Sequence, residues 1–331
     1  MAASSILFLT RAELSDLLDF EEHVQAVEQA FRLQAEQRTL RASLLHVDAP
    51  DGEFHIKAGG LELERLYFAL KVNGGFFENQ RRYGLPNIQG VIVLFDGSTG
   101  SPLAVMDSAD ITLKRTGAAT AVAARHLARP DARTATVCGC GRQGRIQLVA
   151  LKHALPLEQA YVFDSSWEAA CRCAKEMSEV LQFPVIPVRD LAAAVRHSEV
   201  CVTCTPSRAA VLHAGELPAG IFVSAVGADS PDKQELDPAL LAASTVVVDV
   251  LEQCAAAGEL HHAVAAGLMQ PSDVYAELGE IVAGVKPGRR DPDETIIFDA
   301  TGTALQDVAS AAAAYRKAVE HNVGTWMALA E

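Results

Sequence analysis

The chain has 331 residues, of which half are hydrophobic and 21% are charged, and this is enough material for two domains of ordinary size. Its formal net charge of −14 argues against nucleic acid or an anionic membrane surface as a partner, because both repel an acidic protein. No segment approaches the ~20 consecutive apolar residues that a membrane-spanning helix requires.

The first third of the chain combines helical and extended patterns. A strand at 6–9 leads into a helix for which Thr10 is a suitable N-cap, and a second helical pattern covers 21–37. Extended segments and a hairpin follow, so we expect an α+β domain dominated by sheet. The further elements predicted here are strands at 40–47, 54–58, 67–72, 89–94 and 102–106, and an alanine-rich helix at 112–127.

From residue 134 onward, short apolar segments alternate with helical ones. This alternation is typical of a parallel sheet that helices cover on both faces. The tail, Thr303 to Leu329, has a helical pattern and is expected to pack back on the N-terminal domain. The predicted strands are 134–138, 160–163, 185–187, 200–203, 221–225 and 245–249, and the predicted helices are 145–153, 167–181 and 190–197.

A glycine motif follows the first strand of this second region. Gly139, Gly141 and Gly144 form a G-x-G-x-x-G pattern between a strand and a helix. These glycines permit a tight turn, a close approach of the backbone to a pyrophosphate, and close packing of helix on strand. Asp164 ends the next strand, 25 positions after the first glycine (164 − 139), where an acid can bind a ribose 2′-hydroxyl. Because Asp164 would repel a 2′-phosphate, NAD is favoured over NADP.

Three charged side chains occur in or next to apolar segments, where burial of a charge costs free energy unless the charge has a partner or a function. Lys71 lies inside an apolar strand, Arg115 begins an apolar helix, and Asp229 follows a strand of the nucleotide-binding region. Each alone is more often part of a structural ion pair. Together with a cofactor site they are better explained as parts of one catalytic cleft.

The sequence around these residues resembles the ornithine cyclodeaminase/mu-crystallin family. The motifs lie around Lys71, Arg115, 139–144, 227–236 and 302–307, in the family's order and across the whole chain. The resemblance implies an α/β fold in which a Rossmann-type doubly wound parallel sheet is inserted in an α+β domain for substrate binding and dimerisation. The second domain would cover 118–302, the first 1–117 with 303–331, and the protein would be a homodimer.

The same resemblance implies roles for individual residues. Lys71 and Arg115 are similar to groups that hold the substrate carboxylate, and Arg41 is similar to a third member of that set. Asp229 is similar to the general acid/base, Lys71 is placed beside it in the catalytic set, and Lys233 follows closely enough to influence the charge of Asp229. The expected cofactor-binding residues are Thr116, Gly139, Gly141, Arg142, Gln143, Gly144, Asp164, Thr203, Thr205, Val226 and Lys233.

Members of this family exchange a hydride between a substrate Cα and NAD(P) through an imine. Where a cyclodeaminase is expected to carry an acid near the distal amine of its substrate, this chain has His55, with Glu53 on the same strand face. We therefore favour an imine or ketimine reductase, or an amino-acid dehydrogenase, acting on a small amino, imino or 2-oxo acid. The alternatives are redox-neutral ornithine cyclodeamination, which yields proline and ammonia, and a non-catalytic crystallin-like binding protein.

The remaining patterns predict no further chemistry. The chain has seven cysteines, and those at Cys138 and Cys201 occupy apolar strands, where a free thiol acts as a small hydrophobe. No metal is expected at the adjacent His261 and His262, because no acid or cysteine completes a site. The first residues lack the layout of a signal peptide, and free thiols suit a reducing compartment, so a cytoplasmic location is expected.

Overall fold

The computed structural model describes residues 5–328, and its contacts divide the chain into two units. Unit 1 comprises Met1–Ala118 with Thr303–Glu331, and unit 2 comprises Ala119–Gly302. The boundary falls within α4 (Ser108–Leu127), so this one helix contributes residues to both units. No helix within residues 5–328 is long and apolar enough to cross a membrane.

Unit 1 is built on a seven-stranded sheet in the order β17-β1-β6-β5-β4-β3-β2. All neighbouring pairs are antiparallel except β1 and β6, which are parallel. Its elements besides α4 are β1 (Ser5–Leu9), α1 (Arg11–Leu17), α2 (Phe20–Ala35), β2 (Thr39–Ala49), β3 (Gly52–Glu62), β4 (Leu66–Gly75), α3 (Asn79–Tyr83), β5 (Ile88–Asp96), β6 (Pro102–Asp107), α12 (Ala304–His321) and β17 (Thr325–Ala328).

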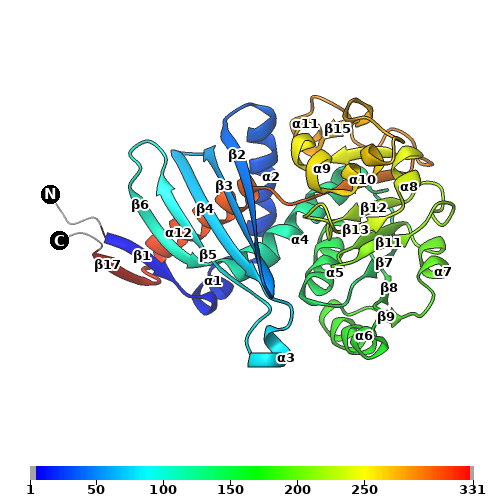
Figure 1. Cartoon of the computed structure of the whole chain (residues 1–331), viewed down its shortest axis with the longest axis horizontal. Coiled ribbons are helices and arrows are strands. Elements are labelled where there is room, and N and C mark those ends of the chain that lie inside the picture. The colour runs from blue at the N-terminus through cyan, green and yellow to red at the C-terminus, as the bar shows by residue number, and fades with distance from the viewer. Residues whose placement is uncertain (1–4, 329–331) are drawn as a thin grey trace. The chain divides into compact units, whose positions relative to one another are not determined.

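The core of unit 1 lies between the sheet and α12. Leu305 and Val308 of this helix pack with Leu61, Tyr67 and Ile92 of the strands, and all five side chains are buried. Figure 1 shows α12 crossing one face of the sheet, with α2 beside it. The prediction that the C-terminal segment packs on the N-terminal region is confirmed.

The predicted length of that C-terminal helix is wrong. The helix ends at His321, because Asn322 and Gly324 adopt left-handed φ angles of 54° and 96°. Thr325–Ala328 then forms β17, which pairs antiparallel with β1. Leu329, where the prediction ended, lies outside the described residues.

At the other end of the chain, Thr10 caps α1 as predicted. Its side chain accepts a hydrogen bond from the Glu13 backbone, and the Glu13 carboxylate accepts one from the Thr10 backbone.

Unit 2 is an eight-stranded parallel sheet in the order β15-β14-β16-β12-β10-β7-β8-β9. The chain runs outward from β7 to β9 and then returns to β10 on the other side of β7. The predicted Rossmann-type doubly wound sheet is confirmed. The elements are β7 (Thr134–Cys138), α5 (Arg142–Ala154), β8 (Gln159–Phe163), α6 (Trp167–Leu181), β9 (Val185–Pro187), α7 (Leu191–Arg196), β10 (Val200–Thr203), β11 (Arg208–Leu212), β12 (Phe222–Ala225), β13 (Gln234–Leu236), α8 (Pro238–Ala242), β14 (Thr245–Val248), α9 (Leu251–Ala257), α10 (Glu259–Ala265), η1 (Pro271–Asp273), β15 (Ala276–Glu277), α11 (Leu278–Val282) and β16 (Ile296–Asp299).

The reversal of strand order between β7 and β10 matters for function. In open α/β sheets, ligands bind at the carboxyl ends of the strands where the order reverses. Gly139 follows β7 at this point, and Cys204 follows β10, with its amide donating to the Cys138 carbonyl at 3.0 Å.

Candidate active site

The glycine motif of unit 2 forms a loop whose shape depends on the absence of side chains. Gly139 has φ of +108°, a conformation that L side chains rarely adopt. A Cβ on Gly144 would lie 1.9 Å from the Gly139 carbonyl oxygen. A Cβ on Gly141 would meet nothing within 4 Å, so the space beside this residue is open.

Helix α5 begins at this loop, and no side chain of the described residues caps the backbone amides of its first turn. Its N-cap is Gly141, which offers no side-chain cap, and its first turn contains no acid. The first amides of a helix favour an anion, through both their hydrogen bonds and the helix dipole. The open space at Gly141 and these uncapped amides fit a dinucleotide pyrophosphate. Arg142 is exposed and Gln143 half-buried at the same turn.

Asp164 lies directly after β8 and is hydrogen-bonded to the glycine loop that follows β7. Its Oδ2 accepts from the Cys140 amide at 2.8 Å, and its Oδ1 accepts from the Ser166 amide at 2.9 Å. The carboxylate is therefore fixed beside the glycine loop, where an adenosine ribose would be bound in a fold of this type.

A second acid, Glu235, holds the loops that follow β10 and β12. Its carboxylate is fully buried and accepts from the Thr205 amide at 2.5 Å and from the Gly227 amide at 2.9 Å. Burial raises the pKa of Glu235 to about 6, against the opposing effect of these hydrogen bonds. Thr203 is buried at the end of β10, and the Val226 amide donates to its carbonyl at 2.9 Å.

Asp229 lies four residues before Lys233 on the segment after β12. Lys233 Nζ donates to Asp229 Oδ1 at 2.6 Å, and the Asp229 side chain is 36% exposed. The predicted acid/base thus carries an adjacent cation and remains accessible.

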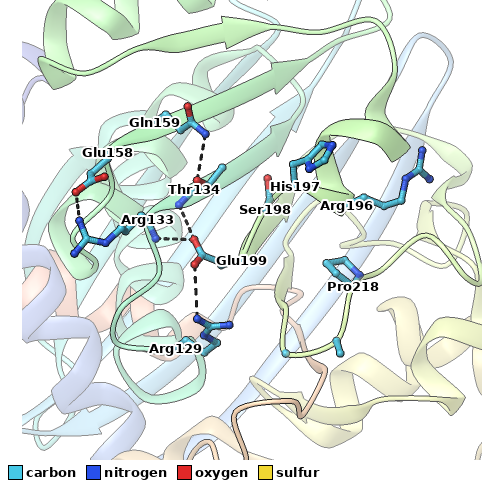
Figure 2. Close-up of a pocket in the computed structure, with 12 residues that line it drawn as sticks. Arg129, Arg133, Thr134, Glu158, Gln159, Arg196, His197, Ser198, Glu199 and Pro218 are labelled. Atoms are coloured by element: carbon cyan, nitrogen blue, oxygen red, sulfur yellow. Dashed lines mark hydrogen bonds and ion pairs between the residues drawn. The ribbon is translucent and has the colours of Figure 1, made fainter.

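The hollow in Figure 2 belongs to the opposite edge of the same sheet. It has a volume of about 730 Å³ and is lined by residues that precede β7, β8, β10 and β12. Its charged groups largely pair with one another, as Glu199 does with Arg129 and with the backbone amides of Arg133 and Thr134. Since ligands bind at the carboxyl ends of parallel strands, this hollow is not the cofactor site.

Unit 1 contains a buried ionic cluster made of Lys71, Arg115 and Asp307. Lys71 Nζ lies 2.6 Å from Asp307 Oδ2, and Arg115 Nε donates to Asp307 Oδ1 at 3.0 Å. Arg115 Nη1 also donates to Gln306 Oε1 at 2.9 Å. The charged side chains are 2% (Lys71), 6% (Arg115) and 2% (Asp307) exposed, so the buried Lys71 and Arg115 both contact one carboxylate.

Burial and neighbouring charge both act on this cluster. Burial is the largest influence and, with the charges of Arg115 and Lys57, lowers the pKa of Lys71 to about 7 against the opposing effect of Asp307. Lys57 faces Lys71 directly across the β3–β4 pair. Burial acts to raise the pKa of Asp307, but the three cations outweigh this effect and hold that pKa below its ordinary value.

The other predicted residues of unit 1 lie on β2, β3 and α4. Arg41 is an exposed residue of β2. His55 lies on β3 with Nε2 3.1 Å from Glu53 Oε1. Thr116 follows Arg115 on α4, and its hydroxyl donates to the Thr112 carbonyl at 2.7 Å.

Sequence reasoning did not assign roles to several residues that the structure places at these sites. Asp307, Gln306 and Glu235 lie in the sequence motifs at 302–307 and 227–236, which give them no individual role. His46 belongs to none of these motifs, although it pairs with His55 across β2 and β3. The symmetric spacing of these two histidines about a turn at 50–51 was the available signal.

The fold and these sites define a two-unit α/β protein with a dinucleotide-type loop in one unit and a buried cationic cluster in the other. The family model of the ornithine cyclodeaminase/mu-crystallin family matches residues 5–322, and the chain belongs to this family. The predicted family and fold class are therefore confirmed.

Individual relatives cover nearly the whole chain. An iminosuccinate reductase of Paracoccus denitrificans is 33% identical over 93% of this chain and 95% of its own. An archaeal alanine dehydrogenase, solved as a dimer with bound NAD, has a TM-score of 0.93 at 36% identity and covers 98% of this chain and 100% of its own. The Δ1-pyrroline-2-carboxylate reductase of Thermococcus litoralis, solved with NADH and L-proline, has a TM-score of 0.92 at 34% identity and covers 97% of this chain and 99% of its own. The prediction that the chain is an enzyme of the oxidoreductase class is confirmed.

Proposed function

We propose that this protein is an NAD(H)-dependent oxidoreductase that acts on the C–N bond of a small amino or imino acid. The reaction is that of an imine or ketimine reductase, or of an amino-acid dehydrogenase. The observation that carries the proposal is the Lys71–Arg115–Asp307 cluster, in which the buried Lys71 and Arg115 both contact a single carboxylate. The remaining positive charge suits the carboxylate of such a substrate.

The cofactor is NAD, bound along the carboxyl edge of the unit 2 sheet. The open backbone at Gly141 and the first amides of α5 hold its pyrophosphate, and Asp164 binds the adenosine ribose. Glu235 keeps the loops after β10 and β12 in place around it. When bound, NAD(H) donates or accepts the hydride at the substrate Cα.

Arg115 and Lys71 orient the substrate through its carboxylate. Arg115 engages Asp307 and Gln306 through Nε and Nη1, which leaves Nη2 as a further donor. Gln306 Nε2 is buried without a hydrogen-bond partner among the described residues, and it provides a second donor on α12. A carboxylate held in this way fixes the orientation of Cα, and orientation contributes much of the rate.

Asp229 moves the proton at the substrate nitrogen. In the reductive direction the imine carbon gains a hydride, the nitrogen gains a proton from the Asp229 carboxyl, and the carboxylate regains a proton from water. In the oxidative direction the carboxylate accepts the proton that the nitrogen loses. Lys233, 2.6 Å from Asp229, stabilises the charged carboxylate between these steps.

The active form is a homodimer that buries the face of the unit 1 sheet turned away from α12. Leu45, Val47, Phe54 and Val91 are 56%, 43%, 38% and 44% exposed. The register places them opposite to the face that carries Lys57 and Lys71. An apolar surface of this kind marks a protein interface.

Ornithine cyclodeamination is the second candidate, and Glu53 is the observation in its favour. The Glu53 side chain is 20% exposed and lies on the same face of β3 as Lys57. Lys57 in turn is the register partner of Lys71 on β4. A carboxylate in this position is suited to a distal ammonium group. Non-catalytic binding of the cofactor is the third reading of the same fold.

The test is NADH oxidation by the purified protein with 2-oxo acids plus ammonia or methylamine, and with cyclic imines. Ornithine with catalytic NAD⁺ runs in parallel and is assayed for proline and ammonia. NADH consumption with an imine supports the proposal. Proline without net NADH change replaces it with cyclodeamination, and tight NADH binding without turnover on any of these compounds replaces it with a binding function.

A further inference from the structure

The hairpin of β2 and β3 brings two histidines and an acid together. His46 and His55 are register partners across the two strands, and Glu53 lies two residues before His55 on the same face. One ring nitrogen of each histidine and a carboxylate oxygen of Glu53 all lie within 4.8 Å of one another. We call His46, Glu53 and His55 the hairpin cluster.

We propose that the hairpin cluster binds a divalent transition-metal ion of the zinc type. Glu53 Oε1 lies 3.1 Å from His55 Nε2, and Glu53 Oε2 lies 3.6 Å from His46 Nε2. Ligand atoms around a tetrahedral zinc ion, with bonds near 2.0–2.1 Å, are about 3.3 Å apart. The two contacts bracket this value, so an ion fits between the three side chains with small movements.

The ligand types select the metal. Two imidazoles and one carboxylate suit zinc and other late first-row ions, whereas calcium and magnesium require a shell of oxygen atoms. Asp48 Oδ1 lies 3.0 Å from His46 Nε2, outside the group of three, and can accept a hydrogen bond from a water bound to the ion. The side chains of His46, Glu53 and His55 are 33%, 20% and 13% exposed, so an ion can reach them from solvent.

The alternative is a hydrogen-bonded group in which both Nε2 atoms carry protons, with His55 paired to Glu53 and His46 to Asp48. The two imidazole rings meet edge to face with centroids 4.7 Å apart, an arrangement that suits either reading. The readings differ in one respect. A metal requires the Nε2 lone pairs to face the centre of the cluster, so only the metal site binds zinc stoichiometrically.

The experiment is calorimetric titration of zinc into the full-length protein after chelation, without cofactor or substrate. One zinc ion per chain is expected, with affinity reduced by ~10²-fold or more in His46→Ala and in Glu53→Gln. The control is His213→Ala, an exposed histidine of unit 2, which retains wild-type affinity. Circular dichroism verifies the fold, and Glu53→Gln preserves the side-chain volume.

Cobalt substitution separates this site from the seven thiols of the chain. Binding by the hairpin cluster gives ligand-field bands without thiolate-to-metal charge transfer. Thiolate bands, or zinc affinity unchanged in His46→Ala and Glu53→Gln, overturn the proposal, as does the absence of stoichiometric binding. Because the measurement includes neither NAD nor a substrate, its failure leaves the proposed function untouched, and the failure of the proposed function leaves this site untouched.

Discussion

Asp307→Asn removes the single negative charge from the buried cluster of Lys71, Arg115 and Asp307 without changing the side-chain volume. In the wild type, Asp307 Oδ2 lies 2.6 Å from Lys71 Nζ, and its Oδ1 accepts from Arg115 Nε at 3.0 Å. Removing one partner of a buried ion pair leaves an uncompensated charge and costs about 3–5 kcal/mol. We expect the free energy of unfolding of unit 1 to fall by about this amount at pH 6.

The decrease in the free energy of unfolding caused by Asp307→Asn should become smaller as the pH rises. The pKa of Lys71 is lowered to about 7 in the folded protein, below the unfolded value of about 10.4, so its charge destabilises the fold fully below pH 7. Asp307 opposes this lowering, and in Asp307→Asn the pKa of Lys71 falls further. At pH 8.5 Lys71 is neutral in both proteins, and only the lost pair with Arg115 remains.

Urea unfolding at pH 6 and pH 8.5 measures these differences. The chain has two tryptophans, and in a Trp167→Phe background the fluorescence of Trp326, on β17, reports unit 1 alone. Lys71→Met combined with Asp307→Asn should recover part of the loss. Asp131→Asn is the control, because its pair with Arg129 is exposed and its loss should leave the urea midpoint near the wild-type value. An Asp307→Asn protein as stable as the wild type at pH 6 would refute the ionic account of the cluster.

Four further outcomes follow from the proposed roles. Asp229→Asn should lower turnover by ~10²-fold or more with NAD affinity nearly unchanged, as stopped-flow and fluorescence titration would show; full turnover would remove Asp229 from proton transfer. Asp164→Ala should weaken NAD relative to NADP, and an unchanged ratio of the two dissociation constants would exclude it from the ribose site. The KM for a carboxylate substrate should rise by ~3- to 10-fold from pH 6.5 to 8.5 as Lys71 loses its proton. Lys71→Arg, which stays charged, should flatten this dependence, and an identical profile would assign it to another group. Leu45→Asp should convert a dimer to monomers in light scattering after gel filtration, and an intact dimer would place the interface elsewhere.

Much of unit 2 was predictable because its signals are local. The helix Trp167–Leu181 was predicted with its observed bounds, since Ser166 caps it and its apolar residues recur at helical spacing. The strand Thr134–Cys138 was predicted equally well, as a short apolar run followed by a glycine turn. In such segments the local preference and the final packing agree.

The C-terminal tail shows where local reasoning fails. Residues 325–328 carry no strong strand signal, and their extended form comes from pairing with β1, which lies more than 300 positions earlier. Asn322 and Gly324 gave a local stop signal in the form of residues that tolerate left-handed backbone. A helical pattern extended over them therefore ran too far.

The buried ionic cluster of unit 1 shows a different limit. Lys71 and Arg115 could be singled out by their costly positions in apolar segments, but their shared partner Asp307 lies 192 positions after Arg115. Nothing local distinguishes Asp307 from any other acid in the first turn of a helix, where such residues are common. The sequence thus indicated that charges were buried, and only the fold identified what compensates them.

Asp307 neutralises only part of the positive charge of Lys71 and Arg115. A carboxylate for each cation would stabilise unit 1 further but would leave no attraction for a substrate anion. Without any carboxylate, burial would lower the pKa of Lys71 still further and leave it neutral at physiological pH. One acid shared by Lys71 and Arg115 opposes the lowering of the Lys71 pKa and leaves the cluster with excess positive charge while Lys71 is protonated. A bound substrate carboxylate would supply the missing negative charge and raise the pKa of Lys71, so that substrate binding and protonation of Lys71 reinforce each other.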